Sequence, residues 1–117
     1  MIIDLPWPPR GLHPNARTHW ATRHKLTRAC RQGAQWAAHS HGHIEADAIN
    51  VTITFHEPDN RRRDMDGMLS NVKAYCDGIA DAIEVDDSKW SIALRRGEVV
   101  KGGTVRFEIE VPKKVKQ

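Results

Sequence analysis

Long hydrophobic runs are absent from this 117-residue chain, and its N-terminus lacks the basic segment followed by an apolar one that marks a signal peptide. The sequence therefore indicates neither a membrane span nor secretion, and we expect a cytoplasmic protein. Cysteine is also scarce, since Cys30 and Cys76 are the only two and they lie far apart in stretches of helical periodicity. Because they form no Cys-x-x-Cys pair, we expect reduced thiols packed in the core rather than a disulfide or a zinc site.

Acidic residues are missing from the N-terminal part of the chain. Between Leu5 and Ile44 there is no Asp or Glu, while six Arg or Lys residues and six of the seven histidines fall there. Between Glu57 and Asp87 the balance reverses, with nine acids against four bases. Either part alone is typical of solvated surface charge. Together they favour a protein that acts on nucleic acid, because the basic part can bind a polyanion and the acidic part can bind a divalent cation.

Length and composition predict one globular domain, residues 1–117, because 39% hydrophobic and 28% charged residues are ordinary for a folded chain of this size. Residues 49–56 alternate strictly between apolar and polar and predict a strand with one buried face. A second alternation over residues 104–111 follows the turn signal Lys101-Gly102-Gly103, and we expect it to form a hairpin with residues 91–99. Residues 2–5 predict a short strand that ends at Pro6, followed by an extended arm up to Asn15.

Two stretches have helical periodicity. The first runs from about Thr22 to His39, and Gly42 is placed to close it. The second runs from Asp66, a candidate N-cap, to about Ile83. The resulting order is β-α-β-α-β-β, which predicts an α+β fold in which two helices cover one face of a small mixed sheet.

The segment that leaves the 49–56 strand carries the residues most suited to chemistry. Asp64 and Asp66 are two positions apart in an extended segment, so both carboxylates can point the same way. Mg²⁺ prefers a few carboxylate oxygens together with water and substrate phosphate, and the pair Asp86-Asp87 is the obvious source of a third acid. On a continuous helix Lys73 shares a side with Asp66, where it can stabilise charge on a phosphate.

Each of these residues also has a purely structural interpretation. Asp66 can cap the helix, Asp86 and Asp87 can cap a turn, and any amphipathic helix has a polar stripe that would contain Lys73. Asp-x-Asp is a weak pattern, so the pattern alone leaves a metal site and these structural roles about equally favoured.

Three separated segments share a resemblance to one known family. The central segment is Arg61-Arg62-Arg63-Asp64-Met65-Asp66, followed in order by Lys73, Asp77-Gly78 and Val85-Asp86-Asp87. The opening segment is Leu5-Pro6-Trp7-Pro8-Pro9, followed by Pro14-Asn15-Ala16-Arg17 and by His19-Trp20. Taken together, and spanning almost the whole chain, these segments resemble the RusA family of Holliday-junction resolvases.

The resemblance implies a RusA-like fold and a homodimer that binds four-way DNA junctions and cuts two strands by symmetric nicks in DNA recombination and repair. It implies an endodeoxyribonuclease that uses Mg²⁺, with Mn²⁺ as a substitute. The catalytic residues that it implies are Asp64, Asp66, Lys73 and Asp87, and the three aspartates are the metal ligands. Asp87 is preferred to Asp86 because the second acid of the pair matches the family pattern. Gly67 departs from that pattern, since the family commonly has Asn there.

Other residues are candidates for DNA contact or for the dimer interface. Three consecutive guanidiniums before the carboxylates suit phosphates that flank a cut, although they can also simply solubilise the loop. In the basic part, an exposed tryptophan can stack on bases, although most tryptophans in a small protein are core. The candidate DNA-binding residues are Arg61, Arg62, Arg63, Arg17, Trp20 and Lys25, and those of the interface are Trp90, Ile92 and Leu94 on a possible edge strand.

Two other functions fit the same residues. A non-catalytic DNA-binding module would use the basic part alone, but it gains nothing from carboxylates beside its arginines, because carboxylates repel phosphate unless a cation intervenes. A metal nuclease that acts on flaps, replication forks or RNA would have the same active-site residues. The sequence favours the junction nuclease over the binding module and does not separate it from the other nucleases.

Overall fold

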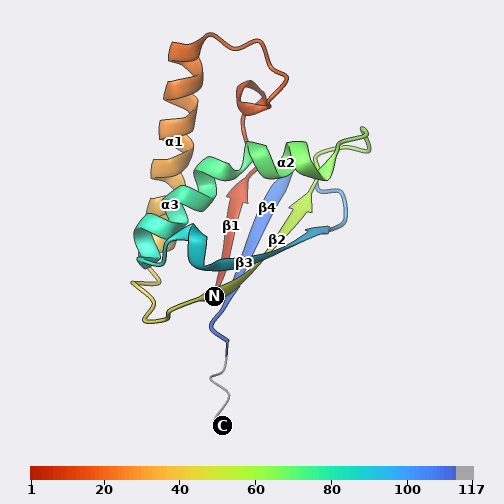
Figure 1. Cartoon of the computed structure of the whole chain (residues 1–117). Coiled ribbons are helices and arrows are strands. Elements are labelled where there is room, and N and C mark those ends of the chain that lie inside the picture. Colours follow the sequence, from red (N-terminus) through yellow and green to blue (C-terminus); the bar gives the residue numbers. More distant parts are fainter. Residues whose placement is uncertain (113–117) are drawn as a thin grey trace.

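A four-stranded sheet with helices packed against it makes up the fold, and the structure, a computed structural model, describes residues 1–112. Figure 1 shows α1 and α3 side by side and α2 crossing near one end of the sheet. Over the described residues the elements are β1 (Ile2–Pro6), the 3-10 helix η1 (Arg10–Leu12), α1 (Trp20–His39), β2 (Ile49–His56), α2 (Met65–Asn71), α3 (Lys73–Ile83), the 3-10 helix η2 (Asp87–Lys89), β3 (Trp90–Arg96) and β4 (Thr104–Glu110). Within this range no helix is long and apolar enough to cross a membrane.

The strands lie in the order β1-β4-β2-β3, so the sheet is mixed and the α+β class is confirmed. β4 is antiparallel to both β1 and β2, whereas β3 runs parallel to β2. The predicted hairpin between residues 91–99 and 104–111 is therefore wrong, because β2 lies between β3 and β4. Burial gives the physical reason: β4 buries every second residue and suits the centre of the sheet, whereas β3 buries only Trp90 and suits an edge.

The predicted alternation of the 49–56 strand is confirmed by the register of the central pair. Val51, Ile53 and Phe55 of β2 face Ile109, Phe107 and Val105 of β4, and all six side chains are buried. The residues between them on β2 are exposed or only partly buried. One face of the sheet is therefore the core face, against which the helices pack, and the other face is polar.

α1 and α3 approach each other closely at Gly78. A Cβ at position 78 would lie 2.1 Å from the backbone oxygen of Arg31 and 3.0 Å from the Cβ of Ala34. Only glycine allows this approach, and α1 adds to it by burying the small residues Cys30, Ala34 and Ala38. α1 begins at Trp20, slightly before the predicted start, and Gly42, with a φ of 71°, closes its end through a hydrogen bond from its N–H to the His39 oxygen (3.0 Å).

The predicted second helix is two helices, so the element order differs from the expected β-α-β-α-β-β. The break falls at Val72, whose φ of −103° and ψ of 8° end α2 and precede α3. Val72 is completely buried, so the break lies on the core side, where one apolar stripe continues from Met68 to Ile83. A periodicity of 3.6 residues fits both halves of this stripe and carries no sign of the break.

Candidate functional site

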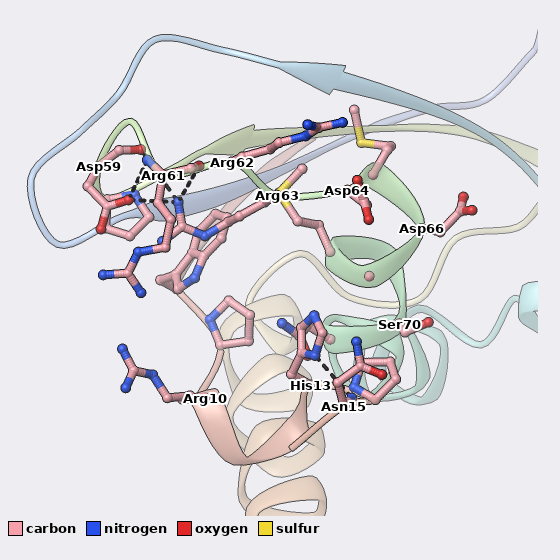
Figure 2. Close-up of a pocket in the computed structure, with 18 residues that line it drawn as sticks. Arg10, His13, Asn15, Asp59, Arg61, Arg62, Arg63, Asp64, Asp66 and Ser70 are labelled. Carbon is pink, nitrogen blue, oxygen red and sulfur yellow. Dashed lines mark hydrogen bonds and ion pairs between the residues drawn. The ribbon is translucent and has the colours of Figure 1, made fainter.

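A pocket of about 930 Å³ opens where the N-terminal arm faces the start of α2. Its walls come from the arm, from the loop after β2 and from α2 itself, within residues 7–15, 58–64 and 65–71 respectively. Figure 2 shows the arginines of the loop on one side and Asp64 and Asp66 on the other, with His13 and Asn15 of the arm below them. The pocket therefore combines groups of both charges within one concave surface, as expected of a binding site.

Asp64 and Asp66 both line this pocket, and both are exposed. Asp64 is the N-cap of α2 in extended conformation, with a φ of −83° and a ψ of 141°, and its side chain makes no capping hydrogen bond. The prediction of Asp66 as the N-cap is wrong, since Asp66 lies in the first turn of the helix. Helix capping therefore does not account for either carboxylate, and both are available to a ligand in the pocket.

Lys73 and Asp87 form a separate pair outside the residues that line the pocket. The ammonium of Lys73 contacts the Asp87 carboxylate and lies 3.3 Å from that of Asp77. The hydrogen bond with Asp87, supported by Asp77, raises the pKa of Lys73 above its ordinary value. α2 and α3 are separate helices with a break at Val72. The prediction that Asp66 and Lys73 lie on one arc of a continuous helix is therefore wrong.

The neighbouring acid Asp86 has the structural role that the sequence left open. It is the N-cap of η2, and its carboxylate accepts a hydrogen bond from the Ser88 N–H at 3.2 Å. This hydrogen bond, together with one from the Ser88 hydroxyl, lowers the pKa of Asp86. Of the two adjacent acids, Asp87 is the one that faces Lys73. In the part of the chain that the structure describes, no three His, Cys, Asp or Glu side chains are grouped as metal ligands.

The three arginines of the loop have different surroundings. Arg61 and Arg62 are exposed and line the pocket. Arg63 turns inward: its side chain is 19% exposed, and its guanidinium donates to the Asp59 carboxylate at 2.9 Å. The same guanidinium lies 5.5 Å from the centre of the Trp7 ring, which is a cation–π geometry. Arg63 therefore holds the loop in place, and Arg61 and Arg62 are the arginines open to an external phosphate.

Arg63 also approaches the partly buried carboxylate of Glu57. Its guanidinium lies 3.7 Å from Glu57 Oε1, a buried oxygen that has no hydrogen-bond partner in the described residues. Arg96 is 3.9 Å from the other oxygen of Glu57. The hydrogen bond from Arg63 to the Asp59 carboxylate lowers the pKa of Asp59. Arg63 thus compensates part of the charge of two acids near the base of the loop, and Arg96 adds to this compensation at Glu57.

The predicted DNA-contacting residues of the basic part are exposed. Trp20 at the start of α1 has 76% of its surface exposed, and Arg17 and Lys25 are exposed near it. The prediction that tryptophans are mostly core holds for Trp90, whose indole donates to the Val85 oxygen at 3.0 Å. It fails for Trp36, which is 81% exposed on α1.

Sequence reasoning missed the contribution of the arm to the pocket. Arg10, His13 and Asn15 line it, although the sequence predicted none of the three as a site residue. The signal was the Pro-rich composition of residues 6–14, which predicts an extended arm but neither the 3-10 helix η1 that interrupts it nor the element that this arm faces. Only the three-dimensional fold brings the arm opposite α2.

Comparison with models of known protein families finds no match. Comparison with curated proteins finds a protein of Xylella fastidiosa (strain Temecula1 / ATCC 700964) with 37% identity over 113 residues. The alignment covers 92% of this chain and 74% of the Xylella protein, which is described as an uncharacterized protein. The similarity therefore extends over nearly the whole chain.

Proposed function

The chain belongs to the same family as this Xylella fastidiosa protein, and from its own site we propose that it is a Mg²⁺-dependent endodeoxyribonuclease that resolves four-way DNA junctions by paired symmetric nicks. The proposed role is in DNA recombination and repair in the cytoplasm. The observation that carries the proposal is the exposed pair Asp64 and Asp66 in a pocket that also contains exposed arginines. Carboxylates beside phosphate-binding arginines repel the phosphate unless a cation binds between the carboxylate and the phosphate. The resemblance to RusA resolvases supports the junction as substrate.

The donor set fits the proposed cation in its chemistry. Carboxylate oxygens are hard ligands of the kind that Mg²⁺ and Mn²⁺ accept, and neither Asp64 nor Asp66 is used in capping. These two residues would hold the cation, and Asp87 is the third carboxylate of the proposal, paired with Lys73 in the structure. When bound, the cation would supply Lewis-acid stabilisation of negative charge on a phosphate.

The protein's own residues supply binding and orientation. Arg61 and Arg62 present two exposed guanidiniums beside the carboxylates, and guanidiniums bind phosphate oxygens through paired hydrogen bonds. Arg17, Lys25 and Trp20 extend the contact surface along the start of α1. Phosphate contacts of this kind fix the position of the nucleic acid without reading its sequence. Selection by the shape of the DNA is therefore the mode of recognition that these residues favour.

The test is cleavage of labelled four-way, forked and linear duplex DNA by the purified protein, in Mg²⁺ and in chelator. We expect cleavage of the four-way junction in Mg²⁺ alone. Asp64→Asn and Asp66→Asn should each abolish cleavage and leave junction binding largely intact, because a cation needs anionic oxygen whereas docking depends on the arginines. Asp47→Asn, at an exposed acid in the loop before β2, is the matched control. Mg²⁺-dependent cutting by either pocket variant at the normal rate would refute the assignment.

A homodimer with two-fold symmetry belongs to the same proposal. Symmetric cuts in two strands of like polarity require two sites related by a two-fold axis, which a symmetric dimer provides. β3 is an edge strand, and Ile92 on it is 43% exposed while Leu94 is partly buried. Trp90, the third residue suggested for the interface, is instead buried in the core. Light scattering at micromolar concentration without DNA should give twice the 13.3 kDa mass of the chain.

A non-catalytic DNA-binding module is the second candidate, and one observation favours it. Asp87 is neutralised by Lys73 and stands apart from the pocket-lining aspartates, so the described residues contain no assembled three-carboxylate group. For such a module, Asp64→Asn and Asp66→Asn would strengthen DNA binding by removing negative charge, and Mg²⁺ would produce no cleavage of any substrate. The cleavage assay described above separates the two candidates.

A further inference from the structure

His13 presents one edge of its imidazole to the start of α2 across the pocket. A Cβ at Gly67 would lie 3.1 Å from His13 Nε2 and 3.9 Å from each of the two ring carbons beside that nitrogen. The ring therefore faces Gly67 with its Nε2 edge. Any side chain at position 67 would cover this edge, and the glycine leaves it open to the pocket that both residues line.

The hydrogen bond at the other ring nitrogen determines which nitrogen carries the proton. The backbone N–H of Asn15 donates to His13 Nδ1 at 3.1 Å. Nδ1 is an acceptor in this contact and carries no hydrogen, so the hydrogen of the ring is on Nε2. The edge that faces the pocket is therefore a hydrogen-bond donor.

The backbone around His13 is held from α1, so the donor has a defined position. The Arg23 guanidinium donates to the oxygens of His13 (3.2 Å), Leu12 (3.3 Å) and Ala16 (2.9 Å). The His13 oxygen also accepts from the Ala16 N–H at 2.9 Å. One arginine thus holds three backbone oxygens of the arm, and this preorganisation lowers the entropic cost of using His13 to bind a ligand.

The surroundings of His13 suit an anionic oxygen. Arg10 on the arm and Arg61 and Arg62 on the loop line the same pocket and are exposed. We propose that His13 binds substrate, its Nε2–H donating to a non-bridging oxygen of a phosphodiester in the pocket, and that Gly67 keeps this donor uncovered. The inference rests on the proposed function for the identity of the substrate as nucleic acid.

Two isosteric substitutions separate this role from a structural one. The amide nitrogen of Gln reaches the position of Nε2, whereas the amide of Asn reaches that of Nδ1 and can keep only the contact with Asn15. We expect His13→Gln to bind a labelled four-way junction within about twofold of the wild type in chelator. His13→Asn and His13→Ala should bind it about tenfold more weakly, as expected for the loss of one hydrogen bond to a charged group. If His13 only shaped the arm, His13→Asn would bind normally and His13→Gln would not, and this result would overturn the proposal.

Gly67→Ala tests the same contact from the opposite wall. A methyl group at this position would cover Nε2, so Gly67→Ala should weaken junction binding by about as much as His13→Ala, and the double variant should be no weaker than either. Alanine favours the helix over glycine, whereas a Cβ 3.1 Å from Nε2 requires a small shift of the ring, so thermal unfolding of Gly67→Ala should show a fold about as stable as the wild type. Additive losses in the double variant would contradict a shared contact.

Failure of this inference and failure of the proposed function give different results. If the wild type cuts junctions in Mg²⁺ but all the His13 variants bind and cut normally, His13 makes no contact and the proposed function stands. If the wild type cuts no DNA, yet binding in chelator follows the predicted order of His13→Gln above His13→Asn and His13→Ala, the phosphate contact stands and the nuclease activity fails. If the wild type binds no nucleic acid, both proposals fall.

Discussion

The ammonium group of Lys73, the first residue of α3, contacts the carboxylate of Asp87, which lies beyond the end of that helix. Asp77, one turn along α3, lies 3.3 Å from the same ammonium. All three side chains keep at least 29% of their surface exposed, so the pair contributes little to the stability of the fold. Its position next to the break at Val72 instead connects the start of α3 with η2, the 3-10 helix that precedes β3.

Lys73→Ala should therefore reduce cleavage without destabilising the protein. The resemblance to RusA resolvases implies that Lys73 stabilises charge on the phosphate, and the loss of one such donor would cost about 100-fold in rate. Junction binding should fall less than about threefold, because one phosphate contact among many contributes little affinity. Lys101→Ala, in the turn before β4, is the control. Normal cleavage by Lys73→Ala would show that the pairing with Asp87 has no part in the reaction.

Arg61 and Arg62 should account for part of the salt dependence of DNA binding. A double change of Arg61 and Arg62 to Ala should weaken binding and lower the slope of log K against log salt by about 2, since each phosphate contact releases about one counterion. The control is Arg95→Ala, an exposed arginine on β3 outside the pocket. Titration of labelled DNA at several salt concentrations gives the slope. An unchanged slope would mean that these arginines do not contact phosphate.

Arg63→Ala should differ from the change of Arg61 and Arg62. It should lower the stability of the fold and leave the salt dependence of DNA binding almost unchanged. Its guanidinium is bonded to Asp59 and packed on Trp7, so its removal leaves Glu57 and Asp59 with less charge compensation. We expect the free energy of unfolding in denaturant to fall by about 1–3 kcal/mol. Arg62→Ala, at the exposed neighbour, should unfold like the wild type. A lowered salt slope for Arg63→Ala with unchanged stability would identify Arg63 as a DNA contact instead.

Two glycines in the helices should respond to alanine in opposite directions. A Cβ at Gly78 would lie 2.1 Å from a backbone oxygen of α1, so Gly78→Ala must push α1 and α3 apart and should destabilise the protein by about 3 kcal/mol. At Gly33 nothing lies within 4 Å of the added Cβ, and Gly33→Ala should stabilise by about 0.5–1 kcal/mol. Thermal or denaturant unfolding of both variants gives the comparison. Equal effects would mean that helix propensity, and not the α1–α3 contact, determines the outcome at position 78.

Local patterns in the sequence predicted the strands better than they predicted which strands pair in the sheet. The alternation in residues 49–56 predicted β2 and its buried face, because that pattern depends only on which side of one strand meets the core. The same alternation in β4 could not show that its neighbours are β1 and β2, since strand pairing depends on contacts between distant segments. The turn at Gly102 and Gly103, both with positive φ, is real, yet it joins strands that are not adjacent in the sheet.

The residues of the candidate site also differ in how well the sequence predicts their positions. Asp64 and Asp66 are close in sequence, and their shared exposure at the start of α2 followed from local spacing. The position of Lys73 depends on the direction of the chain after Val72, and a periodic pattern does not contain that direction. The approach of His13 to Gly67 joins the arm to α2, two segments far apart in the sequence, and arises only in the folded chain.

The central position of β4 has a consequence for the order in which the protein can fold as it is synthesised. β1 is the first strand made, and its partner in the sheet is β4, the last. β2 also remains without its antiparallel neighbour until residues 104–110 leave the ribosome. Folding of the sheet must therefore wait for nearly the whole chain, and the many contacts between its two ends predict a slow folding step. During that interval the apolar strands are exposed, so chaperones have an extended opportunity to bind the nascent chain.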